Sequence, residues 1–216
     1  MNGASPGARA GRTAALIGSI AQTAMFAHAA GAAVVSVHVV GASGMPAADT
    51  VLVFDPLDGE PPASRNSAII DQVHKQFVPR VTVVRTGTSI TFPNSDQIRH
   101  QVYSFSPAKK FTLKLYAGMP SEPVTFDTPG LVVLGCNIHD NMVAFVGVVD
   151  TPYFAKTPPS GIAELNLPAG RYRLRVWHPD LAAAVPPRQV EVQAAPLTLA
   201  VVVDLANSPA SVAAWP

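Results

Sequence analysis

Short apolar runs, each ended by proline or glycine, are the feature of this chain that most restricts its fold. VVSVHVVG (34–41), TVLVFDP (50–56) and FTLKLY (111–116) are examples, and the chain holds 21 prolines and 15 glycines. β-Branched and aromatic residues favour strands, whereas proline and glycine favour the turns between strands. After the N-terminal segment, no stretch keeps the 3.6-residue apolar spacing of a helix. We therefore predict an all-β protein with many short strands and no long helix.

The N-terminal segment has the pattern of an export signal. Two arginines precede the apolar run 13–27, and small-x-small cleavage sites end at Ala29 and Ala32. This pattern predicts a signal peptide over residues 1–29 and a periplasmic or secreted protein. An uncleaved membrane anchor is the alternative. No second apolar stretch of spanning length follows, so we expect no membrane span after the signal is removed.

The charge of the chain argues against one class of partner. The formal net charge is +1, and charged residues make up 13% of the sequence. A protein that binds the phosphate backbone needs a clustered basic face, and the densest local pair here is only Lys109 and Lys110. We therefore expect no nucleic-acid partner.

The only cysteine of the chain lies in the run LGCNIHDNM (134–142). A single cysteine in an exported protein cannot form an internal disulfide, so Cys136 is either a buried, inert side chain or a ligand. His139 follows three residues later and Met142 three residues after that. Since apolar runs flank this segment, we predict that it is a loop between two neighbouring strands. A second histidine, His100, opens another predicted strand.

Two imidazoles, one thiolate and one thioether are a donor set that suits copper. The thiolate and thioether favour the reduced ion, and imidazole tolerates both oxidation states. The serious alternative is a zinc site with one cysteine, two histidines and a water molecule. Methionine is a poor zinc ligand, and Asp140 is the only nearby candidate for a general base. The residues by themselves leave both metals open.

Two runs resemble the plastocyanin-like cupredoxins: VTVVRTGTSITFPNSDQIRH (81–100) and LGCNIHDNMVAFVGVVD (134–150). In that family a strand of the form Gly-Thr-x-Val/Ile-x-Phe-x-Asn leads to the first histidine ligand, and a Cys-x-x-His loop with a methionine supplies the others. The run HQVYSFSPAKKFTLKLYAG (100–118) is also similar to a bacterial subgroup of methylamine-utilisation-like proteins. The resemblance covers roughly residues 66–157.

The resemblance implies a Greek-key β-sandwich that holds one type 1 copper ion. It implies that the ligands are His100, Cys136, His139 and Met142. It further implies that Asn94 joins the two ligand loops by hydrogen bonds and so tunes the copper.

The family's role implies a periplasmic electron-transfer protein that is not an enzyme. Its expected partner is a transient redox protein, such as a cytochrome or a periplasmic oxidoreductase. Two other functions stay open. One is copper binding and delivery, and the other is a non-redox β-sandwich module for adhesion or carbohydrate binding.

The position of Met142 departs from plastocyanin, which has a longer step from histidine to methionine. Here only two residues lie between His139 and Met142. Met142 is predicted to be a weak axial ligand. The alternative is that it fills the core at the start of a strand.

The two ends of the chain resemble pieces of a second, smaller sandwich. Residues 34–60 look like the opening hairpin of the prealbumin-like domains found beside carboxypeptidases, and SGIAELNLPAGRYRLRVWHPDL (160–181) looks like the middle of that fold. Neither piece has enough strands for a core. We therefore predict one discontinuous domain, 34–60 plus 151–207, with a cupredoxin domain (66–150) inserted. Alternatively, residues 34–60 add strands to the cupredoxin.

Overall fold

The computed structural model describes residues 1–3, 31–59, 66–120, 122–206 and 215. These residues form strands and turns and no helix, so the predicted all-β fold class is confirmed. None of the described residues belongs to a helix that would be long and apolar enough to cross a membrane. The predicted signal peptide lies outside the described residues, apart from the first three.

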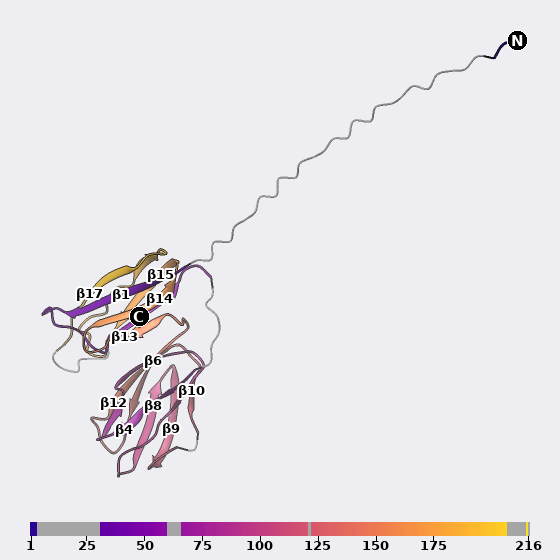
Figure 1. The fold of residues 1–216 in the computed structure, drawn as a ribbon. Helices are drawn as coiled ribbons and strands as arrows, with labels where there is room; N and C mark the ends of the chain where they lie inside the picture. The colour runs from indigo at the N-terminus through magenta and orange to yellow at the C-terminus, as the bar shows by residue number, and fades with distance from the viewer. Residues whose placement is uncertain (4–30, 60–65, 121, 207–214, 216) are drawn as a thin grey trace.

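Two sheets form the first sandwich, shown in the upper half of Figure 1. Their strand orders are β14-β1-β17 and β13-β2-β15-β16. The strands are β1 (Ala32–Gly41), β2 (Val51–Pro56), β13 (Phe154–Lys156), β14 (Ile162–Pro168), β15 (Gly170–Trp177), β16 (Arg188–Val192) and β17 (Leu197–Val203).

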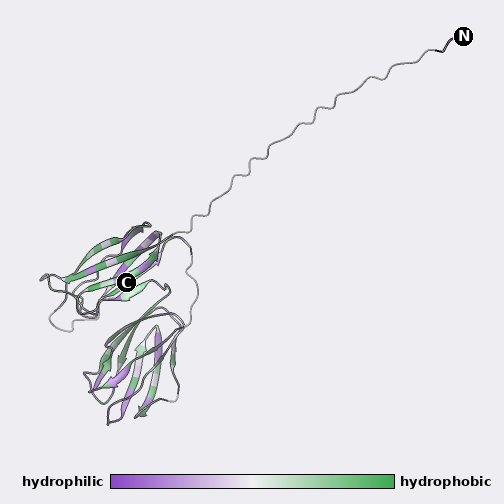
Figure 2. Ribbon diagram, in the orientation of Figure 1, coloured by the Kyte–Doolittle hydropathy of each residue, from purple (hydrophilic) through white to green (hydrophobic). Residues whose placement is uncertain are grey.

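Alternation of side chains explains how β1 joins this sandwich. Val35, Val37 and Val39 are buried, whereas Val34 and His38 are exposed. Successive side chains of a strand point to opposite faces, so the three valines reach one core. Figure 2 shows the same change between apolar and polar residues along the strands. β1 pairs antiparallel with β14 and parallel with β17.

The second sandwich lies in the lower half of Figure 1. Its sheets have the orders β6-β12-β11-β8-β9 and β10-β7-β3, and the hairpin β4-β5 lies beside them. The strands are β3 (Ser67–Ile69), β4 (Asp71–Val73), β5 (Gln76–Val78), β6 (Val81–Arg85), β7 (Thr88–Thr91), β8 (His100–Ser106), β9 (Lys109–Tyr116), β10 (Val124–Phe126), β11 (Gly130–Gly135) and β12 (Val143–Val149).

Strands from the two ends of the chain pair with each other. In the antiparallel pair of β2 and β15, Val51 lies opposite Trp177 and Val53 lies opposite Arg175. The segment from β3 to β12 folds between these strands in sequence and forms the other sandwich. That the two end segments make a domain able to fold by itself stays a prediction, and so does its likeness to prealbumin.

The two sandwiches pack against each other through strands that are buried on both faces. Leu52 and Phe54 of β2 belong to the core of the first sandwich, and their neighbours on β2 point the other way. A strand covered on both sides needs a continuous apolar run, which TVLVFDP provides. The contact cluster consists of Val51, Val53, Val81, Phe145, Val149 and Trp177.

Candidate metal centre

The loop 136–142 connects β11 to β12, as the sequence predicts. Gly135, the last residue of β11, lies under the ring of Tyr103, and a Cβ built there would be 2.7 Å from the ring carbon Cζ. A larger residue immediately before Cys136 would displace the Tyr103 ring. Inside the loop the backbone N–H of Met142 donates to the carbonyl of His139 at 3.0 Å, which closes the turn.

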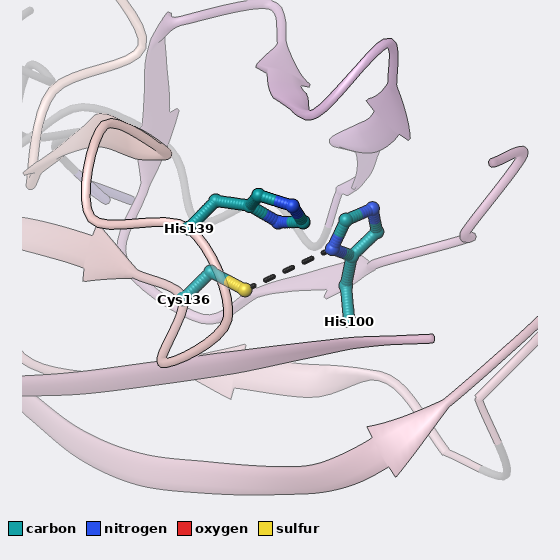
Figure 3. Close-up of side chains that lie close together, drawn as sticks. All are labelled: His100, Cys136 and His139. Atoms are coloured by element: carbon teal, nitrogen blue, oxygen red, sulfur yellow. Dashed lines mark hydrogen bonds between the residues drawn. The ribbon is translucent and has the colours of Figure 1, made fainter. Parts of the chain in front are cut away.

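The fold brings together three of the four predicted ligands. One donor atom each of His100, Cys136 and His139 lies within 4.8 Å of the other two. His100 Nδ1 lies 3.8 Å from Cys136 Sγ, and the two imidazole centroids are 5.2 Å apart. Figure 3 shows the three side chains converging, with the Cys136 sulfur directed at the ring of His100. His100 and Cys136 are buried and His139 is half-buried.

One of the converging donor atoms lacks a hydrogen-bond partner in the described chain, and a metal ion could take the place of that partner. His139 Nδ1 is buried and has no hydrogen-bond partner among the described residues. Burying such a nitrogen without a partner is costly, and a bound cation offsets that cost. Cys136 Sγ accepts the N–H of Ile138 at 3.5 Å, which helps to hold the sulfur in its place beside the two imidazoles.

A hydrogen bond at Nε2, the ring nitrogen that faces away from Cys136, holds His100 in place. Its Nε2 lies 2.8 Å from Oδ2 of Asp96, so Nδ1 is left facing Cys136. Burial acts to raise the pKa of the Asp96 carboxyl, but hydrogen bonds from the N–H groups of Lys75 and His74 and from the His100 ring lower this pKa below its usual value. Asp96 therefore carries a negative charge beside His100. The spacing Asp-x-x-x-His is present in the sequence, but only the folded chain shows that the two side chains meet.

Met142 is 1% exposed and belongs to the same buried cluster as Cys136. It immediately precedes β12, where the chain enters the core of the second sandwich. This position agrees with both readings of the residue, axial ligand and core side chain. Ligation by Met142 stays a prediction.

Asn94 organises the loop that carries His100. Its Nδ2 donates to the carbonyls of Ile98 and Tyr116, both at 2.9 Å, and its Oδ1 accepts the N–H of Asp96 at 3.1 Å. Among the described residues, none of its hydrogen bonds reaches the loop 136–142. Asn94 therefore acts on the His100 side of the site rather than as the link between the two loops.

Another pair links the two ligand loops. Asn137 Nδ2 donates to Oε1 of Gln101 at 2.6 Å, and these residues directly follow Cys136 and His100. The sequence alone does not indicate this pair, because no local pattern shows that Asn137 and Gln101 meet. Asp140, the candidate base of a zinc site, is exposed and lies outside the group of donor atoms.

A buried polar network also lies near the thiol. Gln72 Nε2 donates to the Tyr116 hydroxyl at 2.6 Å, and that hydroxyl donates to the carbonyl of Phe92. Burial raises the pKa of Tyr116 to about 12, so the phenol stays neutral. The network joins β4 to the strands around the site.

No protein-family model matches the chain, and no curated protein sequence matches it. Among solved structures, it is similar to the copper-containing nitrite reductase from Thermus scotoductus SA-01, with 23% identity and a TM-score of 0.37 over 39% of this chain. It is also similar to an amicyanin mutant, with 18% identity and a TM-score of 0.31 over 45% of this chain and 97% of that chain. A purple cupredoxin from Nitrosopumilus maritimus is similar at 20% identity, with a TM-score of 0.30 over 38% of this chain and 98% of that chain.

The match to the nitrite reductase spans only 22% of that chain. The sequence identities to all three structures are 23% or lower.

Proposed function

We propose that this protein transfers electrons through one type 1 copper ion bound by His100, Cys136 and His139, with Met142 as a weak axial ligand. The observation that carries the proposal is the convergence of one thiol and two imidazoles in a mostly buried site. The resemblance of residues 81–100 and 134–150 to plastocyanin-like cupredoxins supports the same ligand set.

The chemistry of the donors favours copper over zinc. A trigonal set of two histidines and one cysteine with a distant thioether is the arrangement of copper electron-transfer sites, in which the ion gains and loses one electron. A catalytic zinc site keeps a position open for water and needs a base near it. In the described part of the chain, no carboxylate belongs to the group of donor atoms. Asp96 contacts His100 at Nε2, the ring nitrogen that does not face Cys136.

Hydrogen bonds from residues outside the ligand set hold the ligands in place. Asp96 fixes His100, and the pair Gln101 and Asn137 joins the strand of His100 to the loop of Cys136. A ligand set that is already positioned moves little when the charge of the ion changes, which favours rapid electron transfer. These contacts support an electron carrier over a site that must release its metal.

We propose a periplasmic location and a weakly bound redox partner, a cytochrome or a periplasmic oxidoreductase. His139 is the half-buried member of the ligand set, and Ile138 beside it is 49% exposed. An apolar side chain next to a ligand near the surface suits a small, transient contact, typically below about 1,200 Å².

Copper titration of the purified chain tests the proposal. We expect one equivalent to bind, an intense visible band, a type 1 electron paramagnetic resonance signal, and bleaching by ascorbate. A copper-loaded, oxidised sample without an intense visible band contradicts the proposal. Loss of copper to an apo partner, without a reversible potential, identifies a delivery protein instead.

A further inference from the structure

We infer that Asp96 is the positioning residue of the metal centre, and that it acts as a clamp between His100 and the turn of the β4-β5 hairpin. The inference rests on the proposed function, because it assigns a role at the same site. Its consequence is that an exposed turn, which contains no predicted ligand, controls the metal affinity and the reduction potential.

The first part of the clamp is the contact with the ligand. His100 is fully buried, and Nε2 lies 2.8 Å from Asp96 Oδ2. An ionised carboxylate accepts only, so Nε2 carries the hydrogen and the lone pair is on Nδ1. Nδ1 is the nitrogen that lies 3.8 Å from Cys136 Sγ. Asp96 thereby selects the tautomer and the ring orientation that a metal ion needs.

The second part of the clamp is the hairpin turn. The backbone N–H of His74 donates to Asp96 Oδ1 at 2.7 Å, and that of Lys75 donates to Oδ2 at 2.8 Å. Both turn residues have positive φ angles, 53° and 61°, which direct two successive N–H groups to one side. The carboxylate is therefore fixed by two backbone donors in addition to His100.

The clamp has an electronic effect on the site. A negatively charged acceptor at Nε2 increases the basicity of Nδ1, which stabilises the oxidised ion more than the reduced ion. Removing the charge should therefore raise the reduction potential. A tenfold greater loss of affinity for Cu(II) than for Cu(I) corresponds to a rise of about 59 mV for one electron.

Asp71 provides a matched control. Its carboxylate accepts the N–H and the hydroxyl of Ser95, at 3.2 and 2.7 Å, and the N–H of Gln72 at 2.7 Å. It thus joins the same hairpin to the same loop, but no hydrogen bond to His100 is found for it in the described chain. Asp71→Asn removes an equal charge and leaves the imidazole contact intact.

Asparagine at position 96 cannot satisfy all three donors. Both carboxylate oxygens accept N–H groups, so the amide of Asp96→Asn places its own donor against one of them. We expect Asp96→Asn to weaken Co(II) binding by roughly 10–100-fold and to raise the copper reduction potential. Asp71→Asn should stay close to the parent protein in both measurements.

The decisive measurements do not depend on copper. Nitrogen-15 NMR of the metal-free parent protein should show His100 with its hydrogen on Nε2. The opposite tautomer overturns the inference, whether or not Asp96→Asn folds. Equal Co(II) affinities for Asp96→Asn and Asp71→Asn also overturn it. If the parent protein binds copper without a reversible potential, the proposed function fails, while the tautomer and Co(II) affinities still decide the role of Asp96.

Discussion

The indole of Trp215 lies against the backbone of Gly147, so closely that a Cβ on Gly147 would be 2.1 Å from the indole carbon Cη2. Gly147 belongs to β12, the strand that leaves the metal loop, and Trp215 also packs on Trp177 of the first sandwich at 5.4 Å between centroids. Trp215 thus fills the space beside β12 that is free because Gly147 has no side chain.

Gly147→Ala should destabilise the protein by about 1–3 kcal/mol, because the new methyl group forces the indole out of its place. Chemical denaturation of the metal-free protein measures this. Gly170→Ala is the control, since its Cβ would come no closer than 3.7 Å to Tyr172. In the double variant with Trp215→Ala, the cost of Gly147→Ala should shrink. Additive effects would show that the two residues are independent.

Cys136→Ser should abolish the visible band of the copper-loaded protein, because the band requires a thiolate ligand. The fold should survive, since serine is close to cysteine in size and the Ile138 N–H retains an acceptor. Absorption and circular dichroism spectra measure both effects. A variant that keeps the band shows that the thiol is not a ligand.

Met142→Leu should still bind copper and should raise the reduction potential, because a weaker axial donor stabilises the oxidised ion less. Leucine conserves the volume of this buried site, so stability should change by less than about 1.5 kcal/mol. Voltammetry measures the potential. Met45→Leu, at a position 67% exposed in the first sandwich, is the control. Unchanged spectrum and potential in Met142→Leu would assign Met142 to the core alone.

His178 should make the metal-free protein less stable in acid. Burial lowers the pKa of His178, although the nearby carboxylate of Asp180 opposes this, and its Nδ1 accepts the N–H of Asp180 at 3.0 Å. The fold favours the neutral ring. Its contribution is therefore complete above the unfolded value of about 6.5 and is lost as the pH falls through the lower folded pKa.

Urea denaturation at neutral and acidic pH measures this loss. His178→Asn supplies an acceptor oxygen that takes no proton in this range, so its stability should fall less between the two pH values. The difference between the two proteins isolates His178 from other groups that titrate. Equal losses would assign the acid sensitivity to those groups.

Local patterns explain why much of the second sandwich could be predicted. The run LVVLG matches β11, VAFVGVV matches β12, and the loop between them begins at Cys136. His100 opens β8, as expected. These features follow from alternation and from turn residues, which operate over a few neighbouring positions.

The clamp at Asp96 could not be predicted in the same way. Its spacing from His100 was visible, but its two other donors are backbone groups of a hairpin more than 20 residues earlier, at His74 and Lys75. For Asn94, a role beside the site was predicted, but its hydrogen-bond partners Ile98 and Tyr116 were not.

Strand period, turn chemistry and residue identity are local properties, so the β character of the protein and the types of donor atom available to a metal follow from the sequence. The contact between His100 Nδ1 and a thiol 36 residues away, and the burial of β2 on both faces, follow only from the folded structure. The same holds for the packing of Trp215 on Gly147. Such contacts depend on how sheets pack face to face, and packing is fixed by the shapes of many distant side chains at once.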